Sequence, residues 1–138
     1  MTVPFLDLTR AYRELQPEFN AAFERVMKSG CYLLGPELEA FERDFAEYCG
    51  ARFCAGVGSG LDALELILRA FGIGQGDEVI VPANTFIATW LAVTHAGARP
   101  VPVEPDPASF NLDPGRIEAA ITPRTRAIIA VDYAGQPC

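Results

Sequence analysis

Histidine and lysine are almost absent from this sequence, which has His95 as its one histidine and Lys28 as its one lysine. A catalytic cysteine usually works beside a histidine, so the scarcity of histidine argues against cysteine catalysis. Four cysteines are present, without a C-x-x-C pair or metal-ligand spacing: Cys31, Cys49, Cys54 and Cys138. We interpret them as reduced structural thiols of a cytoplasmic protein.

Basic residues are also scarce, since 11 of them stand against 18 acidic residues and leave a net charge of -7. A chain this acidic binds nucleic acids and membrane surfaces poorly, so we expect neither as a partner. Charges or prolines interrupt every apolar run before it reaches membrane-spanning length, and the N-terminus lacks the pattern of a secretion signal. The length of 138 residues and the 50% hydrophobic content are typical of one ordinary globular domain.

The stretch Ala55–Leu66 is rich in glycine and reads as a strand that turns directly into a helix. We expect Gly56, Gly58 and Gly60 to adopt backbone angles closed to other residues and to let an anion approach the main chain. The first N–H groups of a helix have no partner inside the helix, and the helix dipole is positive at this end. The sequence therefore predicts a phosphate site at residues 59–61, Ser59–Gly60–Leu61.

Before this stretch, the sequence predicts an N-terminal arm and two helices within residues 1–50. Pro17 suits the first position of one helix, and Gly30 is a stop signal. Pro36 opens the second helix, whose apolar residues recur every three or four positions until Gly50.

From residue 51 onward, short apolar runs alternate with helical patterns. The runs RFCAGV, EVIVP, RPVPVE and RAIIAVDYA read as strands, and the segments between them read as helices. This alternation predicts an α/β fold with a mainly parallel sheet and helices on both faces. We therefore divide the chain into residues 1–50 and an α/β part, residues 51–138. Because the sequence stops at YAGQPC directly after a strand, where a doubly wound sheet would continue with another helix, we expect a truncated piece of a larger domain.

The phosphate turn alone leaves the ligand open, and a dinucleotide is one candidate. The segment GVGSGL has Leu61 where the third glycine of G-x-G-x-x-G belongs, and the next strand ends in Pro82 and Asn84 without the expected acidic residue. The motif therefore argues against NAD.

The segment PANTFIATW places Asn84, Thr85 and Phe86 at the carboxyl edge of the sheet, where ligands of open α/β sheets collect. The ring of Phe86 could stack on a planar cofactor. Alternatively, Phe86 and Trp90 share one helix face and pack the helix onto the sheet.

The segment from Gly56 to Glu104, with NTFIATW and GLDAL within it, resembles the DegT/DnrJ/StrS family of nucleotide-sugar aminotransferases. The likeness extends to DLTRAYRELQPEF and LLGPELEAFERDFAEYCG before it and to NLDPGRIEAAITPRTRAIIAVDYAGQPC after it. The resemblance implies the large domain of the PLP-dependent transferase (aspartate aminotransferase, fold type I) fold and pyridoxal 5'-phosphate as cofactor. It is greatest for the branch that aminates dTDP-linked 3-keto-6-deoxyhexoses.

The resemblance also implies roles for single residues. Ser59, Gly60 and Leu61 match the positions that hold the cofactor phosphate. Many relatives have threonine at the third position, where Leu61 leaves only a backbone N–H to donate. Phe86 matches the aromatic residue stacked on the pyridine ring. The family is dimeric, with active sites at the subunit boundary, so a homodimer is expected.

The family's catalytic lysine and its pyridine-pairing acid both lie beyond the point where this sequence stops, so no catalytic residue is assigned. Lys28 lies at a helix end, and Asp132 is not at the pairing position. The leading hypothesis is an inactive fragment of a transaminase that uses an amino-acid donor, with glutamate expected, and a nucleotide-linked ketosugar. The alternatives are a non-catalytic phosphate-ligand binding module and a Rossmann-type nucleotide binder.

Overall fold

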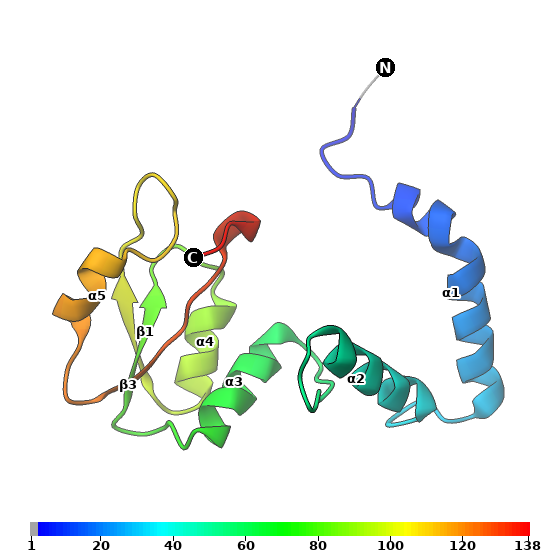
Figure 1. Ribbon diagram of the computed structural model, residues 1–138, viewed down its shortest axis with the longest axis horizontal. Coiled ribbons are helices and arrows are strands. Elements are labelled where there is room, and N and C mark those ends of the chain that lie inside the picture. Colours follow the sequence, from blue (N-terminus) through cyan, green and yellow to red (C-terminus); the bar gives the residue numbers. More distant parts are fainter. Residues whose placement is uncertain (1–2) are drawn as a thin grey trace. The chain divides into compact units, whose positions relative to one another are not determined.

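The computed structural model describes residues 3–138, which divide into two compact units, the first ending at Gly56 and the second formed by Val57–Cys138 (Figure 1). Among these residues, no helix combines the length and apolar character needed to cross a bilayer.

The first unit begins with α1, Thr9–Ser29, which is longer than the sequence pattern predicts. The prediction that Pro17 starts this helix is wrong, because Pro17 lies inside it. At its start, the Asp7 carboxylate accepts hydrogen bonds from the Thr9 N–H at 2.9 Å and from the Thr9 hydroxyl at 2.6 Å, so the first backbone donor of the helix has a partner. The predicted stop is confirmed, since Gly30 caps the helix in the left-handed conformation.

The second helix of this unit, α2, spans Pro36–Tyr48, as the sequence predicts. Its rings of Phe41 and Phe45 stack with their centroids 5.4 Å apart. The strand predicted for RFCAGV is absent from the described residues. Within this segment, the Gly56 N–H instead donates to the Glu42 carboxylate of α2 at 2.7 Å. A strand needs a neighbouring strand for its backbone hydrogen bonds, and Phe53 remains 84% exposed here.

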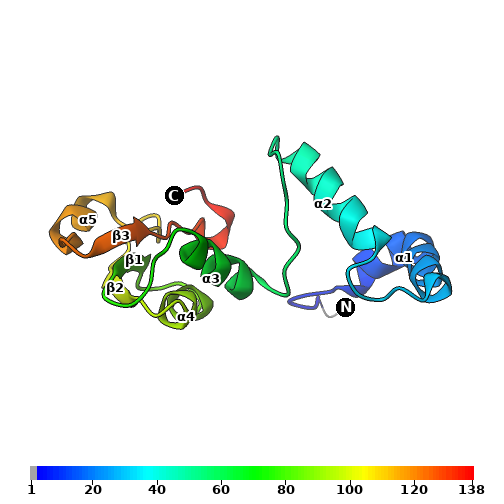
Figure 2. The same cartoon turned by 90° about the horizontal axis from the view of Figure 1, so that it is seen from below.

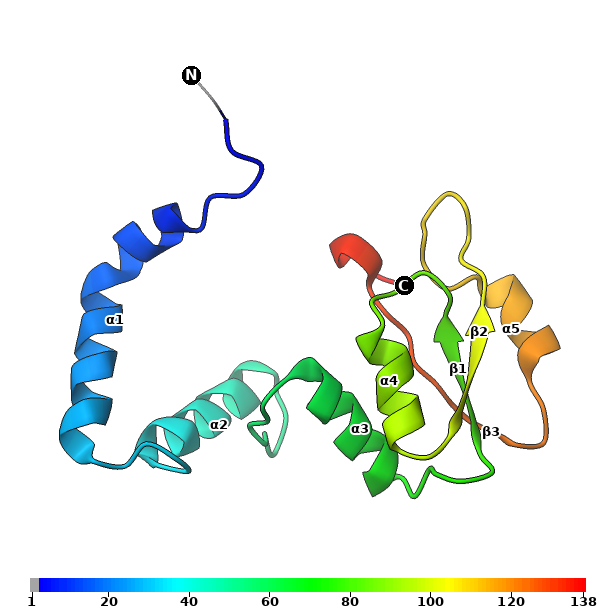
Figure 3. The ribbon, with the colours of Figure 1, turned by 180° about the vertical axis from the view of Figure 1, so that it is seen from behind.

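The second unit alternates helices and strands in the predicted order. It contains the following elements: α3 (Gly60–Ala70), β1 (Glu78–Pro82), α4 (Ala88–His95), β2 (Arg99–Val103), α5 (Pro114–Ala120), β3 (Thr125–Ile128) and the short 3-10 helix η1 (Tyr133–Gly135). The strands form one parallel sheet in the order β2-β1-β3, and they lie side by side in Figure 3. Glu78 pairs with Arg99 and Pro82 with Val103 along the central pair.

Helices cover both faces of this sheet, which confirms the predicted fold class. Alternate residues of β1 point to opposite faces, as the period of a strand requires. Val79 and Val81 belong to a core with residues of α3 and α4, and Ile80 packs in a second core with Val103 and the α5 side. Figure 2 shows α5 and α4 on opposite sides of the strands. All five residues of β1 are buried, as is typical of a central parallel strand.

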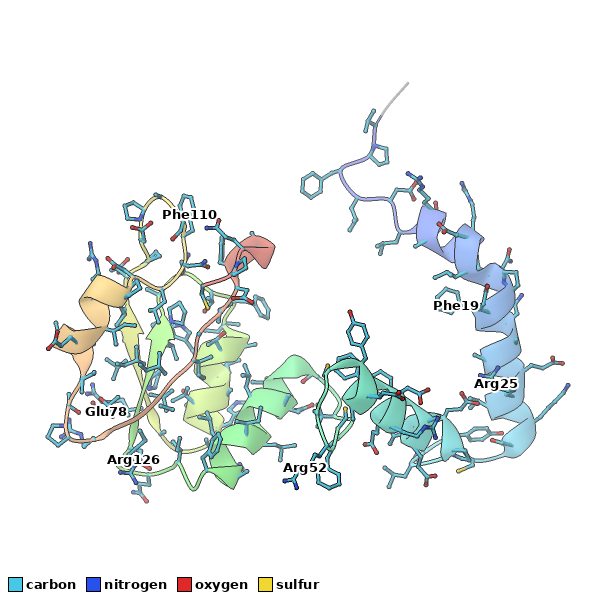
Figure 4. All side chains as sticks on the ribbon, viewed as in Figure 1. Phe19, Arg25, Arg52, Glu78, Phe110 and Arg126 are labelled. Atoms are coloured by element: carbon cyan, nitrogen blue, oxygen red, sulfur yellow. The ribbon has the colours of Figure 1, made fainter. Side chains whose placement is uncertain are left out.

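A buried carboxylate ties the strands together at the amino end of β1. Glu78 is 1% exposed and accepts hydrogen bonds from the Thr122 hydroxyl at 2.6 Å, from Arg99 at 2.6 Å and from Arg124 Nε at 2.8 Å. These donors, the Thr122 hydroxyl first, lower the pKa of Glu78 to about 2. In Figure 4, Glu78 lies at the opposite end of the sheet from Phe110, which marks the carboxyl edge.

Candidate functional site

The first part of the candidate site is the turn that starts α3. Ser59 has an extended backbone and caps the helix, because its hydroxyl oxygen accepts the Asp62 N–H at 3.2 Å. The same hydroxyl donates to the Asp62 carboxylate at 2.9 Å. The N–H groups of Gly60 and Leu61 come first in the helix, and within the described chain no hydrogen-bond partner is found for them. Two backbone donors therefore remain available for an anion.

The glycines of this turn lack the predicted backbone angles, although Gly60 leaves the main chain open to an anion as predicted. Gly56, Gly58 and Gly60 do not adopt the positive φ angles that we expected from the sequence. Space explains two of them: a Cβ on Gly56 would lie 2.5 Å from Leu38, and one on Gly58 would lie 2.9 Å from the Asp62 carboxylate. A Cβ on Gly60 would meet nothing within 4 Å. The approach to the backbone at Gly60 is therefore open.

The second part of the site is the segment between β1 and α4, residues 83–87. Phe86 is 80% exposed, so it does not pack α4 onto the sheet, and the alternative interpretation of this ring is wrong. Trp90 does pack there, against the core under α3 and α4, and its indole N–H donates to the Pro82 carbonyl at 3.1 Å. The two aromatic residues that we considered together thus have different surroundings, and only Phe86 has a free ring face.

The starts of α3 and α4 border one pocket of about 810 Å³. Ser59, Gly60 and Leu61 line it from one helix, and Phe86 lines it beside the other helix. The structure therefore brings all four predicted site residues together within the second unit. Most of the remaining wall is apolar and comes from Ala63, Leu64, Ile87, Ala88 and Leu91.

This arrangement fits a planar molecule with a phosphate group. The unpaired N–H groups at Gly60 and Leu61 suit the phosphate, and the exposed ring of Phe86 suits a heterocycle. Pyridoxal 5'-phosphate has both features, so the residues present are compatible with it. The Asp62 carboxylate opposes an anion here, because it carries a like charge beside the phosphate turn.

Sequence reasoning missed a hydrogen bond that holds the segment before Phe86. The side-chain N–H group of Asn84 donates to the Phe110 carbonyl at 2.9 Å, and these residues are 26 positions apart. The sequence placed Asn84 at the sheet edge, but no local signal indicates a partner so distant. In contrast, Lys28 lies on α1 in the first unit and pairs with Glu24 at 2.9 Å. Asp132 accepts the Cys138 N–H at 2.9 Å, which lowers the pKa of its carboxyl.

Comparison with known proteins places these features in context. Residues 13–138 match the model of the DegT/DnrJ/EryC1/StrS aminotransferase family. The chain is 61% identical over 137 residues to the erythromycin biosynthesis sensory transduction protein EryC1 of Saccharopolyspora erythraea, covering 99% of this chain and 37% of that protein. It is 60% identical over 135 residues to dTDP-3-amino-3,4,6-trideoxy-alpha-D-glucose transaminase of Streptomyces venezuelae, covering 98% and 36%.

A solved structure shows the same fold. The crystal structure of S. venezuelae DesV in complex with a ketimine intermediate matches with a TM-score of 0.95 and 60% identity, over 99% of this chain and 37% of that chain. The chain thus spans somewhat more than a third of the length of the curated relatives it matches.

Proposed function

Because the chain belongs to the DegT/DnrJ/EryC1/StrS aminotransferase family, we propose that it is the cofactor-binding part of a pyridoxal-phosphate-dependent sugar aminotransferase. The enzyme would transfer an amino group from an amino acid, with glutamate as the expected donor, to a nucleotide-linked keto-deoxysugar. The dTDP-linked amino sugar in the name of the S. venezuelae relative and the extent of the sequence identity support a dTDP-linked deoxysugar. The alternative is a phosphate-ligand binding module without catalysis.

One observation carries the proposal: Phe86 and the phosphate turn line the same pocket. In this assignment the N–H groups of Gly60 and Leu61 hold the cofactor phosphate, and Ser59 orders the turn. The ring of Phe86 covers one face of the pyridine. When bound, pyridoxal phosphate supplies an electron sink that allows an amino group to be exchanged for a carbonyl oxygen. The described residues bind and orient the cofactor and exclude water with the apolar wall around Leu64 and Leu91.

We further propose a homodimer and a cytoplasmic location. Large apolar side chains are exposed along both helices of the first unit, including Phe19 and Phe23 on α1 and Phe41 and Phe45 on α2. Exposed apolar surface of this kind is typical of an interface. The cysteines are free, and Cys31, Cys49 and Cys138 are exposed, which favours a reducing compartment.

The decisive experiment uses the protein at the full length that its gene encodes. We expect it to bind pyridoxal phosphate with an absorbance band that borohydride abolishes, and to aminate a dTDP-linked 3-keto-6-deoxyhexose with glutamate, as followed by mass spectrometry. Reversible binding without that band or amination would favour the non-catalytic module. A response to NADH in place of pyridoxal phosphate would favour the Rossmann-type binder.

A further inference from the structure

Three loops lie at the carboxyl edge of the sheet, one after each strand. They span residues 83–87 after β1, residues 104–113 after β2 and residues 129–138 after β3. In Figure 3 the arrowheads of β1 and β2 point toward this edge, where η1 also lies. Asn111 in the second loop is 5% exposed, which is unusual for an asparagine and calls for hydrogen-bond partners.

The side chain of Asn111 joins the second loop to the third. Its Nδ2 group donates to the carbonyls of Gln136 at 3.1 Å and Pro137 at 3.0 Å. Its Oδ1 atom accepts the N–H of Tyr133 at 3.0 Å. The amide therefore binds the third loop at the first residue of η1 and again at the two residues that follow η1. An aspartate of the same shape would keep the acceptor and lose both donors.

The neighbouring residue joins the second loop to the first. The Phe110 carbonyl accepts the Nδ2 group of Asn84, which lies two residues before Phe86. Phe110 has a φ of +60°, a left-handed conformation that is rare for a bulky residue and that persists only when the surroundings impose it. The side-chain amide of Asn84 is also held in one orientation. Its Nδ2 group faces the Phe110 carbonyl, although this leaves its buried Oδ1 atom without a hydrogen-bond partner among the described residues. Turning the amide over would place this oxygen against the Phe110 carbonyl.

We propose that Asn111 is a positioning residue of the cofactor pocket. By fixing the third loop against the second, it holds Phe110 in its left-handed conformation. The Phe110 carbonyl then sets Asn84 and, two residues later, the segment that presents the ring of Phe86. This inference rests on the proposed function, since it assigns to Asn111 the placement of the residue that covers the cofactor.

Hydrogen–deuterium exchange tests the connection between the loops without any cofactor. In the full-length protein, we expect Asn111→Asp to accelerate exchange about tenfold in residues 132–137 and also in residues 83–87, as the loss of hydrogen bonds to a buried group requires. Asn20→Asp is the matched control, because Asn20 is exposed on α1. If exchange accelerates only in residues 132–137, the proposed connection from the third loop to residues 83–87 is wrong, whether or not the protein binds pyridoxal phosphate. If Asn111→Asp fails to fold, the milder Asn111→Ser replaces it.

A double-mutant cycle on cofactor binding tests the positioning role. We expect Asn111→Asp and Asn84→Asp each to weaken pyridoxal phosphate binding about tenfold and to reduce the circular dichroism of the bound cofactor. The double variant should lose little more than either single variant, because both changes break one connection. Losses that multiply, or unchanged affinity with a lower melting temperature, would show that Asn111 is merely structural. If the wild-type protein binds no pyridoxal phosphate, the proposed function fails and the positioning role fails with it, while the exchange experiment still decides whether the loops are connected.

Discussion

Replacing Phe86 with alanine should separate ligand binding from folding. The ring is 80% exposed and contributes little to the core, so Phe86→Ala should change the free energy of unfolding by no more than about 0.5 kcal/mol. The same ring lines the pocket beside Ser59 and is free to stack on a bound heterocycle. The exposure of Phe86 therefore predicts that the residue contributes strongly to ligand binding and hardly at all to stability.

The loss of affinity follows from two contributions. Stacking contributes about 0.5–1.5 kcal/mol beyond the burial of apolar area. Covering one face of the ring removes roughly 60–80 Å² from water, which contributes about 1.5–2 kcal/mol at about 25 cal/mol per Å². Together they predict that binding of pyridoxal phosphate weakens by about 2–3.5 kcal/mol, which raises its Kd roughly 30- to 350-fold.

The assay is an absorbance or fluorescence titration of pyridoxal phosphate into the full-length protein, combined with thermal unfolding. Phe71→Ala is the matched control, because Phe71 is 77% exposed at the end of α3 and does not line the pocket. The control should keep both affinity and stability. Equal affinities for the two variants would refute the stacking role of Phe86. A large loss of stability in Phe86→Ala would show that the ring packs against protein instead.

Three other substitutions test the turn and the sheet. Leu61→Thr adds a hydroxyl to the phosphate turn, so phosphate affinity measured by calorimetry should rise several-fold, by about 1 kcal/mol, and an unchanged Kd would contradict the assignment. Asp62→Asn removes a negative charge that Ser59 contacts at 2.9 Å, so inorganic phosphate should bind about threefold to tenfold more tightly, and weaker binding would argue against a phosphate there. Glu78 has a pKa lowered to about 2 from 4.5, with the Thr122 hydroxyl as the first cause, so its contribution to stability is present above about pH 4.5 and is lost as the pH falls toward 2. Glu78→Gln should lower the melting temperature at pH 7 by about 10 °C or more and flatten its decline below pH 4.5, and a decline as steep as in the wild type would place the acid sensitivity elsewhere.

The sequence predicted the elements of the second unit well because their signals are local. The proline at the first position of α5, the apolar run of β1 and the serine that caps α3 each act within a few residues. The strand expected at residues 52–57 was wrong because the composition of a segment does not supply a neighbouring strand. The start of α1 was missed because the first turn of the helix, where the Asp7 carboxylate accepts the Thr9 N–H, precedes any clear helical periodicity.

The residues that line the pocket could be predicted from the sequence, but the hydrogen bonds that hold its loops could not. The phosphate turn is a local pattern, and Phe86 was found by its place after a strand and by its likeness to a family. The link from Asn84 to Phe110 and the contacts of Asn111 with the third loop span 22 to 26 residues. Contacts this distant depend on how the strands are ordered, and a single sequence does not reveal that order.

The chemistry of the pocket wall limits what these residues do in a transamination. The side chains that line the pocket are one serine hydroxyl, one phenyl ring and otherwise aliphatic groups or glycine, and no acid or base that titrates near neutral pH is among them. Exchange of an amino group for a carbonyl oxygen requires proton transfers, which need a group with a suitable pKa within hydrogen-bond reach. Lys28, the one lysine, belongs to α1 of the first unit and pairs with Glu24. The wall of this pocket therefore binds and orients, and in the proposed enzyme the proton must be moved by a residue outside that wall.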